Sequence, residues 1–121
     1  MPATTEVYAP GDFLLGGYPF ATRSVTIVSG AGVLVRGTVI GQITTGGKYT
    51  TALSASSDGS EVPAYILAED VDATSADKVA LVYDSAVVDG TKLTFGTGIT
   101  SAALEAAMQA IDRAIYVKTP A

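Results

Sequence analysis

Apolar and polar side chains alternate along residues 22–28, the first regular stretch of the chain. One face of this stretch would carry Arg23, Val25 and Ile27, and the other would be mostly polar. Alternation with a period of two is typical of a half-buried β-strand. Further alternating or wholly apolar runs predict more short strands, at 48–53, 64–68, 77–83 and 114–118.

Two of these runs carry more specific expectations. The run 64–68 is apolar throughout and follows Pro63, which predicts a strand that starts there and is buried on both faces. In the run 77–83, Val79, Leu81 and Tyr83 fall on one face of the strand. Asp89-Gly90, between residues 87–88 and 92–95, predicts the tight turn of a hairpin.

Glycines interrupt the apolar run over residues 32–43. Gly37 and Gly41 lie between β-type segments, beside the charged Arg36. Glycine weakens a flat strand and usually marks a bulge, a bend or a close approach of another backbone. We therefore predict a bent strand pair here, in a small and curled β structure.

One segment follows a helical period instead. Over residues 100–113, apolar side chains recur at the spacing of one helix face, at Ala103, Leu104, Ala107, Met108 and Ile111. Thr100 or Ser101 can cap the start of this helix. The fold class expected is mainly β, with one helix in the C-terminal half packed against a β core.

The first 21 residues differ from the rest. They hold three of the five prolines and four of the nine aromatic residues. Proline and glycine at this density prevent regular structure, while an ordinary disordered tail is poor in aromatics. We predict a flexible, extended N-terminal arm over 1–21 that a partner orders, joined to a β-rich domain over 22–121. The alternative is an arm that packs on its own domain.

Composition narrows the class of protein. The 121 residues suit one domain, and cysteine and histidine are absent. The net charge is −5 with scattered basic residues, which argues against direct nucleic-acid binding. No apolar run reaches membrane-spanning length. No lysine or arginine precedes Arg23, so the chain lacks the basic N-terminal region that a signal peptide has. We expect a soluble intracellular product with no membrane partner.

Two motifs invite a chemical interpretation. Asp70-Val71-Asp72-Ala73-Thr74 is similar to the opening of aspartate phosphotransferases, but those enzymes need a larger doubly wound domain. As a calcium loop, the segment would have Ser75 and Leu81 where glycine and glutamate belong. We therefore expect a solvated acidic connection between two buried strands, although a weak cation site there remains an alternative.

Residues 41–48 come close to a phosphate-binding loop. Gln42 and Tyr49 stand where that motif needs glycine and serine or threonine, so a hairpin turn is expected. Without histidine, a serine nucleophile would need Lys48 or Lys78 as its base, and the spacing singles out neither. We expect no catalytic residue, no metal site and no cofactor.

Several segments, in order, resemble a known family. They are 22–30, 32–41 and 64–73, with Gly11-Asp12-Phe13 before them and the late helix ending in Ile115-Tyr116-Val117-Lys118 after them. Together they resemble the phage head decoration proteins of the lambda protein D type, over roughly residues 11–118. The resemblance implies a small β-clip-like barrel without enzymatic activity.

The resemblance also implies a role and partners. Family members form homotrimers on the threefold and quasi-threefold sites of an expanded capsid, and they stabilise it against internal DNA pressure. Their location is the outer capsid surface of the virion, and the host cytoplasm before assembly. Their N-terminal arm orders on the capsid by adding a strand to the major capsid protein.

A capsid contact through the arm agrees with the residues themselves, because an extended aromatic segment suits strand addition. The candidate capsid-binding side chains are Val7, Tyr8, Phe13, Leu14 and Tyr18. Two other functions stay open. One is a β-clip-type trimeric enzyme such as a nucleotide pyrophosphatase, which needs a carboxylate metal site. The other is a β module that binds a small ligand or sugar in a preformed pocket.

Overall fold

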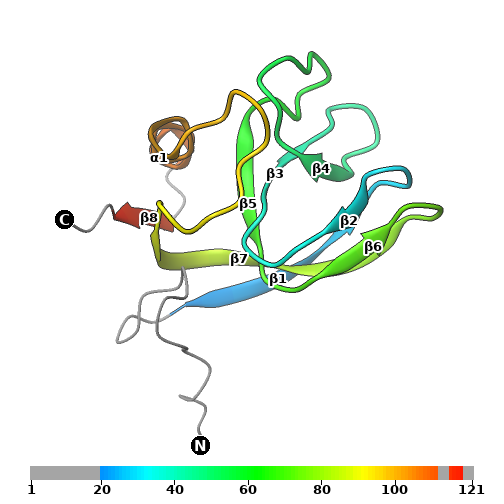
Figure 1. Ribbon diagram of the computed structural model, residues 1–121, viewed down its shortest axis with the longest axis horizontal. Helices are drawn as coiled ribbons and strands as arrows, with labels where there is room; N and C mark the ends of the chain where they lie inside the picture. Colours follow the sequence, from blue (N-terminus) through cyan, green and yellow to red (C-terminus); the bar gives the residue numbers. More distant parts are fainter. Residues whose placement is uncertain (1–19, 112–114, 119–121) are drawn as a thin grey trace, which may run out of the picture.

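The computed structural model describes residues 20–111 and 115–118 (Figure 1). The elements are β1 (Ala21–Ile27), β2 (Gly32–Leu34), β3 (Val39–Gln42), β4 (Tyr49–Thr51), β5 (Pro63–Leu67), β6 (Val71–Ala73), β7 (Lys78–Asp89), α1 (Ser101–Ala110) and β8 (Ile115–Lys118). Of the described helical residues, none form a segment with the length and hydropathy of a membrane span.

Five strands close into a barrel. The order is β1-β4-β3-β5-β7, and β7 pairs back with β1 to complete the ring. The closing pair is antiparallel over the whole of β1, with Arg23 opposite Val82 and Val25 opposite Ala80. The β1–β4 contact is parallel and limited to Ile27 and Tyr49. The prediction of a mainly β, small barrel with one helix in the C-terminal half is confirmed.

Strand β5 separates two hydrophobic cores. Its Tyr65 and Leu67 face the barrel interior with Ile27, Ile40 and Val82, among others. The intervening Ile66 faces the opposite way, into a second core on the side of helix α1. This alternation confirms the prediction that the run 64–68 is buried on both faces, and Pro63 starts the strand as expected.

The second core lies between the barrel and helix α1, which packs against β5 and β8 (Figure 1). Leu104 and Met108 of α1 are fully buried there. Burial of each such side chain contributes about 1.5–3 kcal/mol. The helix begins as predicted at Thr100, whose hydroxyl accepts a hydrogen bond from the Ala103 amide at 3.1 Å. Strand β8 then pairs in parallel with the end of β7.

The glycine-rich segment bends as predicted, but its two strands do not form a pair. β2 pairs with β6 in a separate two-stranded ribbon, whereas β3 pairs with β4 and β5. Between them the chain turns at Gly37, which has a φ of 95°. The Gly37 amide donates to Leu67 on β5, so the two strands diverge toward different partners.

Gly41 provides the predicted close backbone approach. The pairing of β3 with β5 shifts register between Ile40 and Gly41. A Cβ atom at Gly41 would overlap the carbonyl oxygen of Ser60 and lie 2.8 Å from that of Val62. The loop before β5 therefore crosses directly over the glycine.

The hairpin predicted at Asp89-Gly90 is only half correct. A turn follows β7 there, with the Asp89 carboxylate accepting from the Thr91 amide at 2.9 Å. The chain after it does not return along β7. Instead Thr94 pairs with the segment before β3, where its amide donates to Gly37 and its carbonyl accepts from Val39. Leu93 is thereby buried in the second core.

Candidate functional site

The side chains predicted to bind a partner, Val7, Tyr8, Phe13, Leu14 and Tyr18, lie outside the described residues. The described chain begins at Phe20, directly before β1. The exposed fraction of Phe20 is 40%, and the first four residues of β1 are exposed as well. The candidate contact surface therefore begins at Phe20 and extends along the outer faces of β1 and β7.

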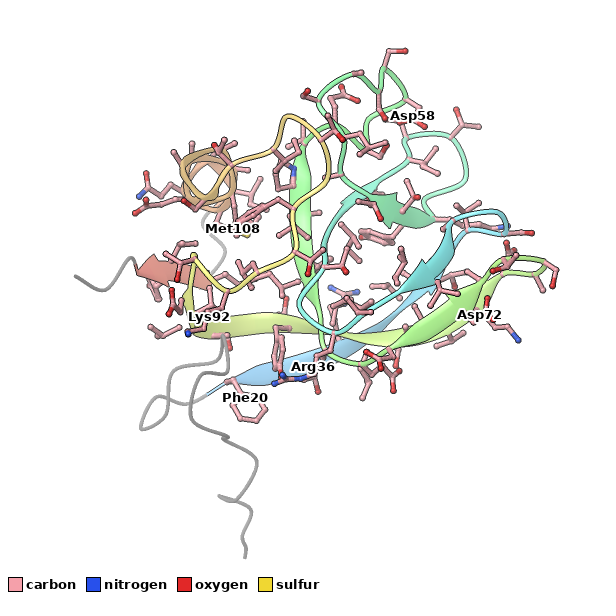
Figure 2. All side chains as sticks on the ribbon, viewed as in Figure 1. Phe20, Arg36, Asp58, Asp72, Lys92 and Met108 are labelled. Atoms are coloured by element: carbon pink, nitrogen blue, oxygen red, sulfur yellow. The ribbon has the colours of Figure 1, made fainter. Side chains whose placement is uncertain are left out.

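Tyr83 on β7 lies beneath Phe20 and Arg36. The Phe20 and Tyr83 rings meet edge to face, with centroids 5.6 Å apart. Arg36 Nη2 donates to the Tyr83 hydroxyl at 3.0 Å, and its guanidinium lies 6.0 Å from the ring centroid. The Arg36 amide also donates to Asp70 Oδ1 at 2.7 Å. Figure 2 shows Phe20 and Arg36 on the same side of β7. Tyr83 is only 4% exposed, because its side chain also packs in the second core, next to its strand partner Ile66.

A second arginine–tyrosine pair lies at the end of the barrel interior. Arg23 Nη1 donates to the Tyr65 hydroxyl at 3.0 Å, and the guanidinium lies 5.7 Å from the ring centroid. The Tyr49 ring packs against Tyr65 at 5.6 Å. Tyr65 is buried, so its hydroxyl needs a hydrogen-bond partner inside the protein, and Arg23 supplies one. This pair anchors the exposed start of β1 to the barrel.

Val79 and Leu81 continue the Tyr83 side of β7. The three side chains share a face, as predicted, but this is the outer face of the barrel. The exposed fractions are 69% for Val79 and 40% for Leu81. Ala80 and Val82, between them, fill the interior. We call the row Phe20, Tyr83, Leu81 and Val79 the outer row.

The acidic segment around Asp72 has structural roles. Residues 71–73 form β6 of the ribbon, so the segment is more than the expected connection between strands. Asp72 Oδ1 accepts from the Thr74 hydroxyl at 2.6 Å and from the Thr74 amide at 3.1 Å. Both hydrogen bonds lower the pKa of Asp72, and the bond from the Thr74 hydroxyl has the larger effect. The same Asp-x-Ser/Thr arrangement recurs at Asp58 with Ser60 and at Asp89 with Thr91.

Loop 41–48 forms the expected hairpin between β3 and β4. The Ile43 amide donates to the Lys48 carbonyl at 2.7 Å and closes the turn. Lys48 Nζ bonds Asp77 Oδ2 at 2.6 Å, and the other oxygen of that carboxylate accepts from the Ser29 amide at 2.7 Å. Lys48 is thus paired with a carboxylate that ties the turn after β1 to the barrel.

A groove of about 330 Å³ lies beside α1, and no residue of the outer row lines it. Its lining comprises Gln42, Thr44, Gly59, Val62, Pro63, Ala64, Ala107 and Ile111, with no ionisable side chain among them. The Gln42 amide group donates to the Gly47 carbonyl at 3.1 Å, so it is engaged in the hairpin turn. Over residues 20–111 and 115–118, no three acidic side chains gather closely enough to hold a metal ion.

These features define a small closed β-barrel whose most distinctive surface is apolar and aromatic, a character typical of protein contacts. The chain belongs to the family described as bacteriophage lambda head decoration protein D, whose model matches residues 3–115. No curated protein matches the chain. The family predicted from the sequence is therefore confirmed, and it is a family of structural proteins of the phage head, located on the virion capsid.

Proposed function

We propose that this protein is a trimeric decoration protein that binds the threefold sites of an expanded phage head. From the outer capsid surface it stabilises the shell against the pressure of packaged DNA. The family match over residues 3–115 is the observation that carries the proposal, because it covers most of the N-terminal segment as well as the barrel. Before assembly the protein resides in the host cytoplasm.

The N-terminal arm makes the main contact in this proposal, through Val7, Tyr8, Phe13, Leu14 and Tyr18. It adds a strand to the major capsid protein, so that backbone hydrogen bonds provide affinity and alternate side chains provide specificity. The exposed start of β1 supports this arrangement, because a partner that binds the arm meets accessible backbone and side chains next. Three arms in one trimer multiply weak contacts through effective concentration.

The charge of the protein is compatible with this location. A net charge of −5 disfavours contact with packaged DNA, since binding to phosphates needs clustered basic residues. An acidic protein on the outside of the shell faces no such requirement.

Deletion of residues 1–19 tests the role of the arm. This truncation keeps Phe20 and its contact with Tyr83. The truncated and full-length proteins are mixed with expanded, undecorated heads, and bound protein is measured after sedimentation. We expect loss of binding by the truncated protein at concentrations that saturate the heads with full-length protein. Undiminished binding of the truncation would overturn the arm's role.

Two further measurements test the other parts of the proposal. Light scattering of the free protein should give three times the 12.2 kDa protomer mass. DNA-filled heads should release their DNA at a higher temperature when decorated than when bare. A protein that is monomeric both in solution and on heads would contradict the trimer. Equal release temperatures for decorated and bare heads would contradict the stabilising role.

A further inference from the structure

We propose that the open end of the outer row, Val79 and Leu81 on β7, is a second contact with the head surface, made by the barrel itself. This inference rests on the proposed function and names a part of the capsid contact outside the N-terminal arm. Its partner is an apolar patch of the shell protein next to the place where the arm binds.

The outer row forms a graded surface along one strand. Alternate residues of a strand project from the same face about 7 Å apart, so Tyr83, Leu81 and Val79 follow one another along β7. Their exposed fractions rise from 4% to 40% to 69% in that order. Phe20 covers the Tyr83 end, and nothing in the described part of the chain covers Val79.

The rest of the outer face of β7 is already packed. The pairing with β1 shifts register next to Tyr83, and beyond this shift Ala86 and Val88 are buried with Tyr83 in the second core, beside α1 and β8. Tyr83 in the middle lies under Phe20 and Arg36. The apolar character of the face continues past the point where side chains of the described residues cover it.

The neighbouring strand β1 has polar residues on its outer face, as strands with one face in water usually do. On the same outer face, β1 places Ser24 opposite Leu81 and Thr26 opposite Val79. A barrel strand with one face in water usually alternates apolar inward and polar outward residues, as β1 does. Val79 and Leu81 depart from this alternation and lie outside both cores, and they extend the apolar row that Phe20 and Tyr83 begin. A continuous exposed apolar patch is a feature of contact surfaces.

The position of the remaining chain identifies the occupant. Residues 1–19 join the barrel at Phe20, the covered end of the outer row. A shell protein that holds the arm is therefore brought to this face at high effective concentration, where even a small apolar contact adds affinity. The groove beside α1 also has exposed apolar residues, Val62 at 55% and Ile111 at 52%, but Phe20 is not among the residues that line it.

The test is the double substitution Val79→Thr with Leu81→Thr in the full-length protein. Threonine suits a strand because its side chain is β-branched, and it reduces the apolar contact at two positions outside the core. The matched control is Val62→Thr with Ile111→Thr, at the groove. Affinity is measured on expanded, undecorated heads over a concentration series, and mass in solution by light scattering.

We expect the β7 double variant to bind heads at least tenfold more weakly than the wild type, with an unchanged mass in solution. The control pair should bind within twofold of the wild type. Equal binding by the β7 variant would overturn the inference, and so would a change in its mass, which would assign the outer row to a contact between copies. If the wild type itself does not bind heads, the proposed function fails first.

Discussion

Substitution of Gly41 by alanine tests how closely the loop before β5 crosses β3. The added Cβ would overlap the Ser60 carbonyl oxygen and would lie 2.7 Å from the Ser60 carbonyl carbon and 2.8 Å from the Val62 oxygen. All three are backbone atoms, so no flexible side chain can yield. Forcing an extra carbon into packed structure costs about 1–3 kcal/mol, and the backbone contacts place Gly41→Ala at the upper end.

The matched control is Gly30→Ala, because Gly30 has open space around its Cβ position but a φ of 92°. Its cost is that of the left-handed backbone alone, about 1 kcal/mol. Urea unfolding of both variants at one protomer concentration gives the two free energies of unfolding. We expect Gly41→Ala to lose about 2 kcal/mol more than Gly30→Ala. Equal losses would refute the close approach.

Two more predictions concern the second core and acid stability. Leu104→Ala should lower the free energy of unfolding by about 2–5 kcal/mol, because Leu104 is fully buried. The control Ile111→Ala, at a half-exposed site just after the same helix, should lower it by under about 0.5 kcal/mol. Similar losses in the two variants would contradict the assigned packing. At Asp77, hydrogen bonds from Lys48 and then from the Ser29 amide lower the pKa below 3.8, so its stabilising contribution is complete above that value and is lost as the pH falls through the lowered folded-state pKa. Asp77→Asn should therefore lower the thermal midpoint at neutral pH and flatten its fall below about pH 4, and an unchanged acid profile would refute this.

Short-range patterns predicted most of the elements. The alternation in β1, the apolar run of β5 and the Thr100 cap of α1 each depend on residues within a few positions of one another. The three Asp-x-Ser/Thr turns could also have been predicted from neighbouring residues. Asp-x-Ser/Thr occurs at Asp58, Asp72 and Asp89, and each carboxylate bonds the residue two positions on, a local signal that the sequence reading did not use.

The candidate site depended on contacts between distant segments. Arg23 meets Tyr65 from 42 residues away, and Arg36 meets Tyr83 from 47. No spacing rule links such pairs, because the closure of the barrel brings their strands together. The divergence of β2 from β3 has the same origin, since their partners β6 and β5 come later in the chain.

The amino-acid sequence alone determined the family, the mainly β class and the location of most strands and of the helix. These follow from local periodicity and from motifs in a recognisable order. Only the tertiary structure decided which side of each strand faces inward. Alternation shows that the two faces of β7 differ, but the faces are assigned by its register with β1 and β5, which puts Ala80 and Val82 in the barrel and leaves Val79 and Leu81 outside. Register is a property of paired strands, and it exists only once the sheet has closed.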